Sequence, residues 1–442
     1  MVDGRIAVQR HRIAHWRVAA AGLLFAVAMV LALRPATYLV GIVLLFIPYR
    51  VLWSRVGVTD ALGWLLVPAL TLLAALAAFL VLTERGGGAI VRVATLGLAL
   101  ILTIDFYIAA SSLKIDRRGR ATLMMCALAA LLALSAETRL GLLERLHATP
   151  FSGPFYPVNF NRAAVLFALV LSGVLAALAA GRPVWRGGGT APAPAADDGA
   201  RARARASTGT GDGADGPAGG QAGGRAGVLG MGLGIALATF AILTLSRSES
   251  AMLVLLCALP AIAVVVWLPR IAAWMPAAIL LLGTLASLFA STLMRDVYDW
   301  AQPRFLDGVV AARLDIWERV GRAIVESGAR PHGFEATRMI PPPPGLEGIF
   351  HPHNGGLQML LDVGWPGFAA AIVLAALAGR ALSRHQPALL VPATCFVIVT
   401  LVSHGVWQSW WLSVPPLIAI SAMLLPWTDR DGTVARDGTA PV

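Results

Sequence analysis

Apolar runs separated by short polar loops dominate the pattern of this chain. About 17 to 25 apolar residues cross a bilayer as a helix, and by that measure the pattern predicts about twelve spans. The predicted spans lie near residues 18–33, 37–53, 62–83, 89–113, 121–136, 163–180, 228–246, 251–268, 271–293, 357–379, 386–403 and 410–427. The sequence therefore predicts an all-α polytopic membrane protein.

The basic residues of the short loops orient these spans. Cytoplasmic loops are enriched in Arg and Lys. The loops around Arg50, Lys114, Arg182, Arg270 and Arg380 all fall inside when the N-terminus is placed in the cytoplasm. Both termini are then cytoplasmic, and the long loop between the ninth and tenth spans lies outside.

The predicted organisation follows from the spans and the two long loops. In chain order it comprises the first six spans in residues 1–180, a cytoplasmic linker at 181–227, the next three spans in 228–293, a large outer loop at 294–356, and the last three spans with a cytoplasmic tail in 357–442.

The 181–227 linker is rich in Gly, Ala and Pro and has no apolar periodicity, so we expect a disordered spacer. It contains Arg201, Arg203 and Arg205 with no aromatic side chain between them. Nucleic-acid binding is therefore not expected. Contact of these arginines with anionic lipid headgroups is the alternative to a plain spacer.

The outer loop at 294–356 mixes charges of both signs and includes a predicted helix. Its middle, residues 311–327, repeats apolar side chains at intervals of three and four residues, Trp317 among them. Gly328 ends this helix, and the run Pro341–Pro344 forces an extended segment. We expect the amphipathic helix to lie at the membrane interface with Trp317 as an anchor.

Composition agrees with the membrane class and excludes others. The chain has 442 residues, of which 57% are hydrophobic and 13% are charged, and its mean hydropathy is +0.73. Soluble domains carry about 25% charged residues, so a soluble fold and a disordered chain are excluded. The net charge of +11 lies mostly in the inner loops and the linker, where it sets the topology.

Several arginines, histidines and other polar residues fall on the predicted outer face. They are Arg247, Arg313, Trp317, Arg338, His351, His353, Asn354 and His404. Arginine presents a planar fork of donors that matches phosphate oxygens, and histidine suits proton transfer near neutral pH. We interpret the set as a site for transfer of a group from a polyprenyl diphosphate to a hydroxyl. His353 would accept the hydroxyl proton, and Arg247 and Arg313 would stabilise the departing diphosphate.

Each of these residues also has a structural interpretation. Arg247 could snorkel at a helix end, and Arg313 could lie on a solvated helix face. Trp317 could be an anchor or core residue, and Asn354 could cap the tenth span. A metal site is the competing chemistry, but no acidic residue stands beside His353, so we expect neither metal nor cofactor.

Three segments in this order resemble the O-antigen ligase and polymerase superfamily. Leu245–Ser248 places Ser-Arg after a span, and Arg313–Glu318 contains Arg-x-x-x-Trp. His353–Gly367 begins His-Asn-x-x-Leu-Gln and ends Asp-x-Gly-x-x-Gly. The chain departs from the pattern at Asp362, where the family often has Glu, and in the proline run after Arg338.

The resemblance implies a metal-independent membrane glycosyltransferase with a large periplasmic loop that carries short helices. Its donor is an O-antigen glycan on undecaprenyl diphosphate, and its acceptor is a sugar hydroxyl of lipid A core. The site faces the periplasm from the bacterial inner membrane, and the reaction inverts the anomeric centre. By the same resemblance, Arg247 and Arg313 bind the diphosphate and His353 is the base.

Other functions stay open at this point. A polymerase would use a lipid-linked glycan as acceptor, and an O-oligosaccharyltransferase would use a protein hydroxyl; acceptor choice depends on loop shape. A non-enzymatic transporter of lipid-linked glycans would show polar residues within the spans and an internal repeat. Arg92, Asp105 and Arg162 are the few polar candidates, and the sequence has no evident repeat.

Overall fold

The computed structural model describes residues 157–180, 248–289, 308–341 and 352–421, together with short pieces between residues 11 and 126 and residue 240. Predictions for the remaining residues lie outside the described part, including most of the first five spans, the 181–227 linker and the C-terminal tail. The described part is helical apart from strands β1 (His11–Arg12) and β2 (Leu113–Lys114), which pair in parallel.

The helices follow the apolar pattern of the sequence. They are α8 (Pro157–Ala180), α11 (Glu249–Trp267), α12 (Pro269–Ala272), α13 (Met275–Leu288), α16 (Gly308–Glu326), α17 (Gly355–His385), α18 (Leu390–Val402), α19 (Ser409–Leu412) and α20 (Val414–Ser421), with the 3-10 helices η2 (Ala336–Met339) and η3 (Pro387–Leu389). Helices α8, α11, α13, α17 and α18 coincide with predicted spans, and α16 coincides with the predicted amphipathic helix.

Two helices of the described part are long and apolar enough to cross a membrane, Glu249–Trp267 and Gly355–Arg384. The apolar stretches of α8, α13, α18 and α20 are shorter. The mostly helical fold is confirmed by these elements. The number of spans and the periplasmic position of the outer loop stay predictions.

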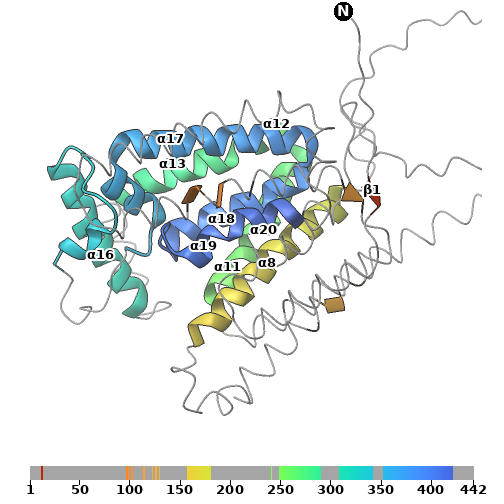
Figure 1. Cartoon of the computed structure of the whole chain (residues 1–442), viewed down its shortest axis with the longest axis horizontal. Helices are drawn as coiled ribbons and strands as arrows, with labels where there is room; N and C mark the ends of the chain where they lie inside the picture. The colour runs from red at the N-terminus through yellow and green to blue at the C-terminus, as the bar shows by residue number, and fades with distance from the viewer. Residues whose placement is uncertain are drawn as a thin grey trace, which may run out of the picture.

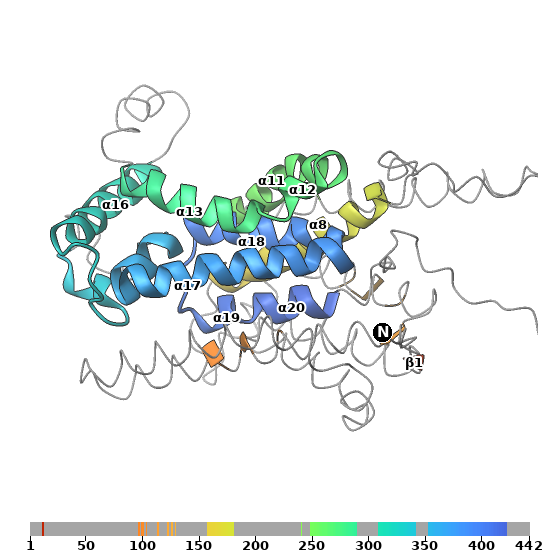
Figure 2. The ribbon, with the colours of Figure 1, turned by 90° about the horizontal axis from the view of Figure 1, so that it is seen from above.

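Helix α18 lies at the centre of the described bundle. It contacts α8, α11, α13 and α17, and most of its residues are buried. The long helices run side by side, and α16 lies at one end of the bundle (Figures 1 and 2). That end contains the C-terminus of α18 and the N-termini of α11 and α17, and it is where the segment with His353 meets α16.

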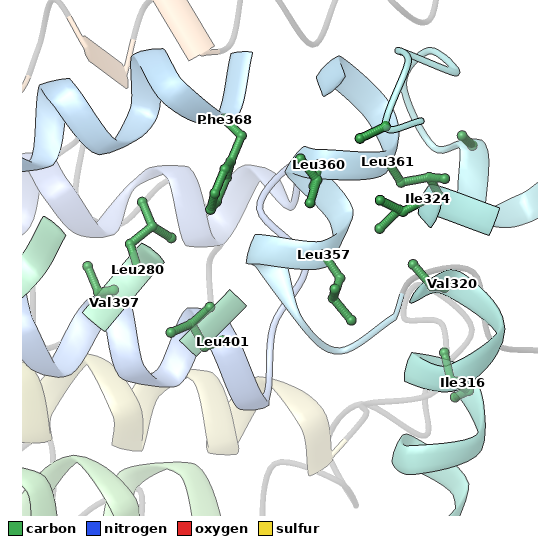
Figure 3. Close-up of a cluster of buried hydrophobic side chains, with 12 residues drawn as sticks. Leu280, Ile316, Val320, Ile324, Leu357, Leu360, Leu361, Phe368, Val397 and Leu401 are labelled. Carbon is green, nitrogen blue, oxygen red and sulfur yellow. The ribbon is translucent and has the colours of Figure 1, made fainter. Parts of the chain in front are cut away.

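The apolar face of α16 is buried against the bundle. Ile316, Val320 and Ile324 share one helix face, because positions four residues apart point the same way, and all three are buried. They join one cluster with Leu357 and Leu360 of α17 (Figure 3). The face predicted to lie on the membrane interface therefore packs on protein, because α17 offers a complementary apolar surface.

Gly364 divides α17 into a short N-terminal segment and a long C-terminal segment. Its backbone has φ 64° and ψ −171°, a conformation that only glycine adopts readily. A Cβ there would lie 2.8 Å from the Ala329 carbonyl oxygen and close to Pro331. The next amide, that of Trp365, donates to the same Ala329 oxygen at 3.3 Å. The kink thus holds the segment after α16 against α17.

Candidate active site

His353 lies in the short segment before α17, with its imidazole half-buried. Its Nδ1 lies 3.0 Å from the Ser403 carbonyl oxygen. Because a carbonyl only accepts hydrogen bonds, Nδ1 carries the proton, and the lone pair of the neutral ring is on Nε2. Nε2 is therefore the nitrogen that can take a proton from a substrate.

The surroundings of His353 favour the neutral imidazole. Burial lowers the pKa of His353 below its ordinary value of 6.5, the Ser403 carbonyl opposes this, and the positive charge of Arg313 adds to the lowering. Desolvation disfavours the charged form of any buried base. His353 is accordingly in the form required of a general base at neutral pH.

Arg313 projects from α16 onto the same turn. Its Nη1 donates to the Val402 carbonyl oxygen at 3.2 Å. Val402 is the last residue of α18 and Ser403 is its C-cap. The final carbonyls of a helix have no partner within the helix and attract cations. The end of α18 therefore offers adjacent acceptors that hold both Arg313 and His353.

Ser403 also ties this turn to the start of α11. Its hydroxyl shares a hydrogen bond of 2.7 Å with the hydroxyl of Ser250. Helix α11 begins with Ser248 as its N-cap, which accepts from the Ala251 amide at 3.2 Å. Arg247 directly precedes Ser248 in the sequence. Arg247 itself and His351 lie outside the described residues, so their roles stay predictions.

Asn354 and Gln358 fasten the N-terminal segment of α17. The Asn354 side chain accepts from the Leu357 amide at 3.0 Å and donates to the Ser287 hydroxyl of α13 at 2.8 Å. The Gln358 side chain accepts from the Val406 amide at 3.0 Å. Asn354 is thus the cap of α17, as its structural interpretation predicts, and both side chains hold the frame around His353.

Asp362 is fully buried one turn beyond Gln358. It accepts from the indole of Trp407 at 2.6 Å and from the amides of Glu335 and Ala336 at 3.1 and 3.0 Å. The shorter reach of Asp where the family often has Glu is therefore sufficient for three donors. This carboxylate joins the 403–408 turn to the segment that follows α16.

Trp317 is a core and hydrogen-bonding residue. Its indole packs against the apolar cluster of α16 and α17. Its Nε1 donates to the Pro352 carbonyl oxygen at 2.8 Å. The interpretation of Trp317 as a core residue agrees with these contacts, and its hydrogen bond holds the carbonyl of Pro352, the residue directly before His353.

Arg338 and His404 lie in surroundings different from those of His353. Arg338 is exposed on η2 and forms an ion pair of 3.2 Å with Glu335. His404 is buried, with ring centroids 4.7 Å from both Trp410 and Trp411. The Arg162 guanidinium lies 5.2 Å from the centroid of Trp410. These contacts describe a surface pair and an aromatic cluster, whereas Arg313 and His353 share the end of α18.

An apolar cavity of about 350 Å³ lies between α13, α17, α18 and α20. Its lining includes Met359, Val363, Val406 and Trp407. Val406 and Trp407 belong to the turn that follows Ser403. The cavity is therefore lined in part by the same turn that holds His353.

Sequence reasoning missed some of these residues for a physical reason. Ser403 acts on His353 through its backbone carbonyl, which every residue possesses, so nothing in its side chain signals the contact. Asp362 had a usable signal, because a carboxylate within an apolar span is costly unless it has partners. Within the described part, no three His, Cys, Asp or Glu side chains form a group suited to a metal ion.

The comparison with known families bears on this arrangement. Residues 233–372 match a family model described as O-antigen ligase. The matched segment contains Arg247, Arg313 and His353 together with α11, α13 and α16. No curated protein matches the chain.

Proposed function

We propose that this chain is a glycosyltransferase of lipopolysaccharide biosynthesis, because residues 233–372 match the family model described as O-antigen ligase. It moves an O-antigen glycan from undecaprenyl diphosphate to a sugar hydroxyl of lipid A core, at the periplasmic face of the inner membrane. The observation that carries this proposal is the placement of a neutral imidazole and a guanidinium on adjacent carbonyls of one helix end.

The proposed reaction is one direct displacement. The acceptor hydroxyl oxygen attacks the anomeric carbon, and its proton passes to Nε2 of His353. The bond from that carbon to the diphosphate oxygen breaks, and the diphosphate leaves with the electron pair. One displacement inverts the anomeric centre, and no metal or cofactor takes part.

Arg313 suits the leaving group in this scheme. A guanidinium has five N–H donors, so anchoring by Nη1 to Val402 leaves donors for phosphate oxygens. A preorganised cation stabilises charge that develops on the departing diphosphate. Arg247 would act beside Arg313. It directly precedes Ser248, the N-cap of α11, and the start of α11 is tied to the same turn by the hydrogen bond between Ser250 and Ser403.

The apolar cavity suits the prenyl chain of the carrier. Its lining is almost wholly apolar side chains, among them Leu280, Leu374 and Ile418. Burial of apolar surface is favourable and non-directional, so a flexible hydrocarbon chain can occupy such a space. The carrier would then bind with its chain in the cavity and its diphosphate toward Arg313.

The test is a deletion strain, with and without the gene restored, whose lipopolysaccharide is read on gels. Each outcome refers to the deletion strain and should be reversed when the gene is restored. Loss of the ladder with glycan polymer accumulating on the lipid carrier supports the ligase. Core bearing a single repeat indicates a polymerase, and intact lipopolysaccharide with lost protein glycosylation indicates an O-oligosaccharyltransferase. Either outcome contradicts the proposed acceptor. Inhibition of the purified protein by a chelator would contradict the metal-free mechanism.

A further inference from the structure

Helix α16 contacts the candidate site at two points one turn apart. Arg313 and Trp317 are four residues apart and so lie on the same helix face. Arg313 donates to the carbonyl of Val402, and Trp317 donates to the carbonyl of Pro352 at 2.8 Å. Val402 directly precedes Ser403. Pro352 directly precedes His353, so α16 holds the chain just before each partner of the His353–Ser403 hydrogen bond.

The backbone of His353 needs such support. Its φ is 52°, in the left-handed region that non-glycine residues rarely adopt. A strained conformation of this kind persists only where the surrounding structure holds it. Pro352 is buried on one side of His353, and Asn354, the cap of α17, is buried on the other. The imidazole reaches the Ser403 carbonyl from this conformation.

We propose that Trp317 is a positioning residue for His353. Its indole N–H holds the Pro352 carbonyl and so maintains the left-handed turn that directs the imidazole to Ser403. This inference rests on the proposed function, because it assumes that His353 is the base. Trp317 acts through His353 and does not itself touch the substrate.

Loss of the Trp317 hydrogen bond should slow the chemical step and leave donor binding unchanged. Without the indole N–H, the buried Pro352 carbonyl loses its donor, and the imidazole can leave the Ser403 carbonyl. A displacement of about 1 Å at a catalytic group can cost about 100-fold in rate. The diphosphate contacts of Arg313 and Arg247 do not depend on this bond, so the affinity for the donor is kept.

The groups around His353 set the expected pH response. Among the charged residues of α16, Arg313 is the one that acts on His353, and its positive charge disfavours the imidazolium. On the α18 side the next titratable residue, His404, packs among tryptophans. On the α17 side the neighbour is the uncharged Asn354. A loosened His353 gains water, and its pKa rises toward the ordinary value.

The experiment compares Trp317→Phe with the wild-type full chain in lipid nanodiscs, using a defined glycan on undecaprenyl diphosphate and purified lipid A core. We expect kcat to fall by about 10- to 100-fold with donor KM unchanged. The acid limb of the kcat profile should move to higher pH, and diethyl pyrocarbonate should modify His353 faster. Trp274→Phe is the matched control, because Trp274 is exposed near Arg380 on α17, and it should behave as wild type.

A second variant covers failure of Trp317→Phe to fold. Replacement of Trp317 by 3-benzothienylalanine puts sulfur in place of the ring N–H and keeps the shape, so it should show the same loss. Wild-type kcat and an unmoved acid limb, or a loss confined to donor KM, would overturn the inference. An active His353→Ala protein would instead overturn the assignment of His353 as the base, and an inactive wild-type protein would overturn the proposed function. An inactive His353→Ala protein beside a normal Trp317 variant would overturn the positioning role alone.

Discussion

Arg313 and His353 bind consecutive backbone carbonyls, those of Val402 and Ser403, where α18 ends. The two side chains come from segments on either side of the proline run, and α18 follows both in the chain. A single helix terminus thus sets the relative position of a guanidinium and an imidazole. This arrangement leads to specific expectations for variants of either residue and of the frame around them.

Replacing His353 should abolish catalysis while the protein still folds and inserts into the membrane. General base catalysis contributes about 100- to 10,000-fold, so we expect His353→Ala to lose transfer by that factor and still insert normally. His353→Asn is the informative partner, because Asn tolerates the left-handed backbone and retains a donor for Ser403. Both variants should be inactive in glycan transfer. Rescue by Asn would mean that His353 is structural.

Arg313→Lys should weaken use of the donor although the charge is kept. Lysine lacks the planar fork that binds two phosphate oxygens and also reaches the Val402 carbonyl. We expect kcat/KM for the lipid-linked donor to fall about 10-fold or more, which corresponds to about 1.4 kcal/mol. The control is Arg322→Lys on the same helix, since Arg322 is exposed and pairs with Glu318 at 3.0 Å. Equal effects at both positions would argue against a diphosphate contact.

The rate should depend on pH through His353. Its pKa is lowered by burial, so the base form persists at neutral pH, and kcat/KM should fall only below the ordinary value of 6.5. The same sign applies to stability: between the ordinary and the lowered pKa, the unfolded chain binds a proton that the folded chain does not, so stability falls as pH falls. Arg313→Gln should move the acid limb of the kcat/KM profile to higher pH, because loss of the positive charge raises the pKa of His353. A limb centred above 6.5 in the wild type would contradict this assignment.

Replacement of Asp362 should lower the stability of the protein, because Asp362 holds the frame and does not take part in the proposed reaction. Asp362→Ala leaves the Trp407 indole and the amides of Glu335 and Ala336 without their acceptor. An unsatisfied buried donor costs about 1–3 kcal/mol, so the variant should unfold at a markedly lower temperature in detergent. Glu326→Ala, at an exposed position on α16, is the control and should leave the unfolding temperature unchanged. A stable Asp362→Ala protein would show that these bonds contribute little.

Two glycines with positive φ differ in what an added side chain would meet. Gly328 and Gly364 both have φ 64°. A Cβ at Gly328 meets nothing within 4 Å, whereas at Gly364 it would lie 2.8 Å from the Ala329 oxygen. Gly328→Ala should cost about 1–2 kcal/mol for the left-handed conformation alone. Gly364→Ala should cost more, because its ψ of −171° at this φ lies in a region that only glycine adopts readily and its Cβ would also clash. It should also reduce transfer, as measured by thermal unfolding and a glycan-transfer assay. Equal costs would mean that neither the backbone conformation of Gly364 nor its contact with Ala329 carries the expected penalty.

The sequence by itself determined the helical elements and the chemistry available to them. Apolar side chains at three- and four-residue intervals are enough to specify α16, and Gly328 is enough to end it, because these effects act within one turn. The candidates Arg313 and His353 could likewise be chosen by residue type and predicted side of the membrane.

Only the tertiary structure decided how those candidates are held. His353 binds a carbonyl fifty positions away in the chain, and Trp317 binds the carbonyl of Pro352. Backbone carbonyls are the same in every residue, so no sequence pattern marks the ones that accept. Their positions depend on how α16, α17 and α18 pack, and packing of the buried apolar faces therefore sets the geometry of the candidate site.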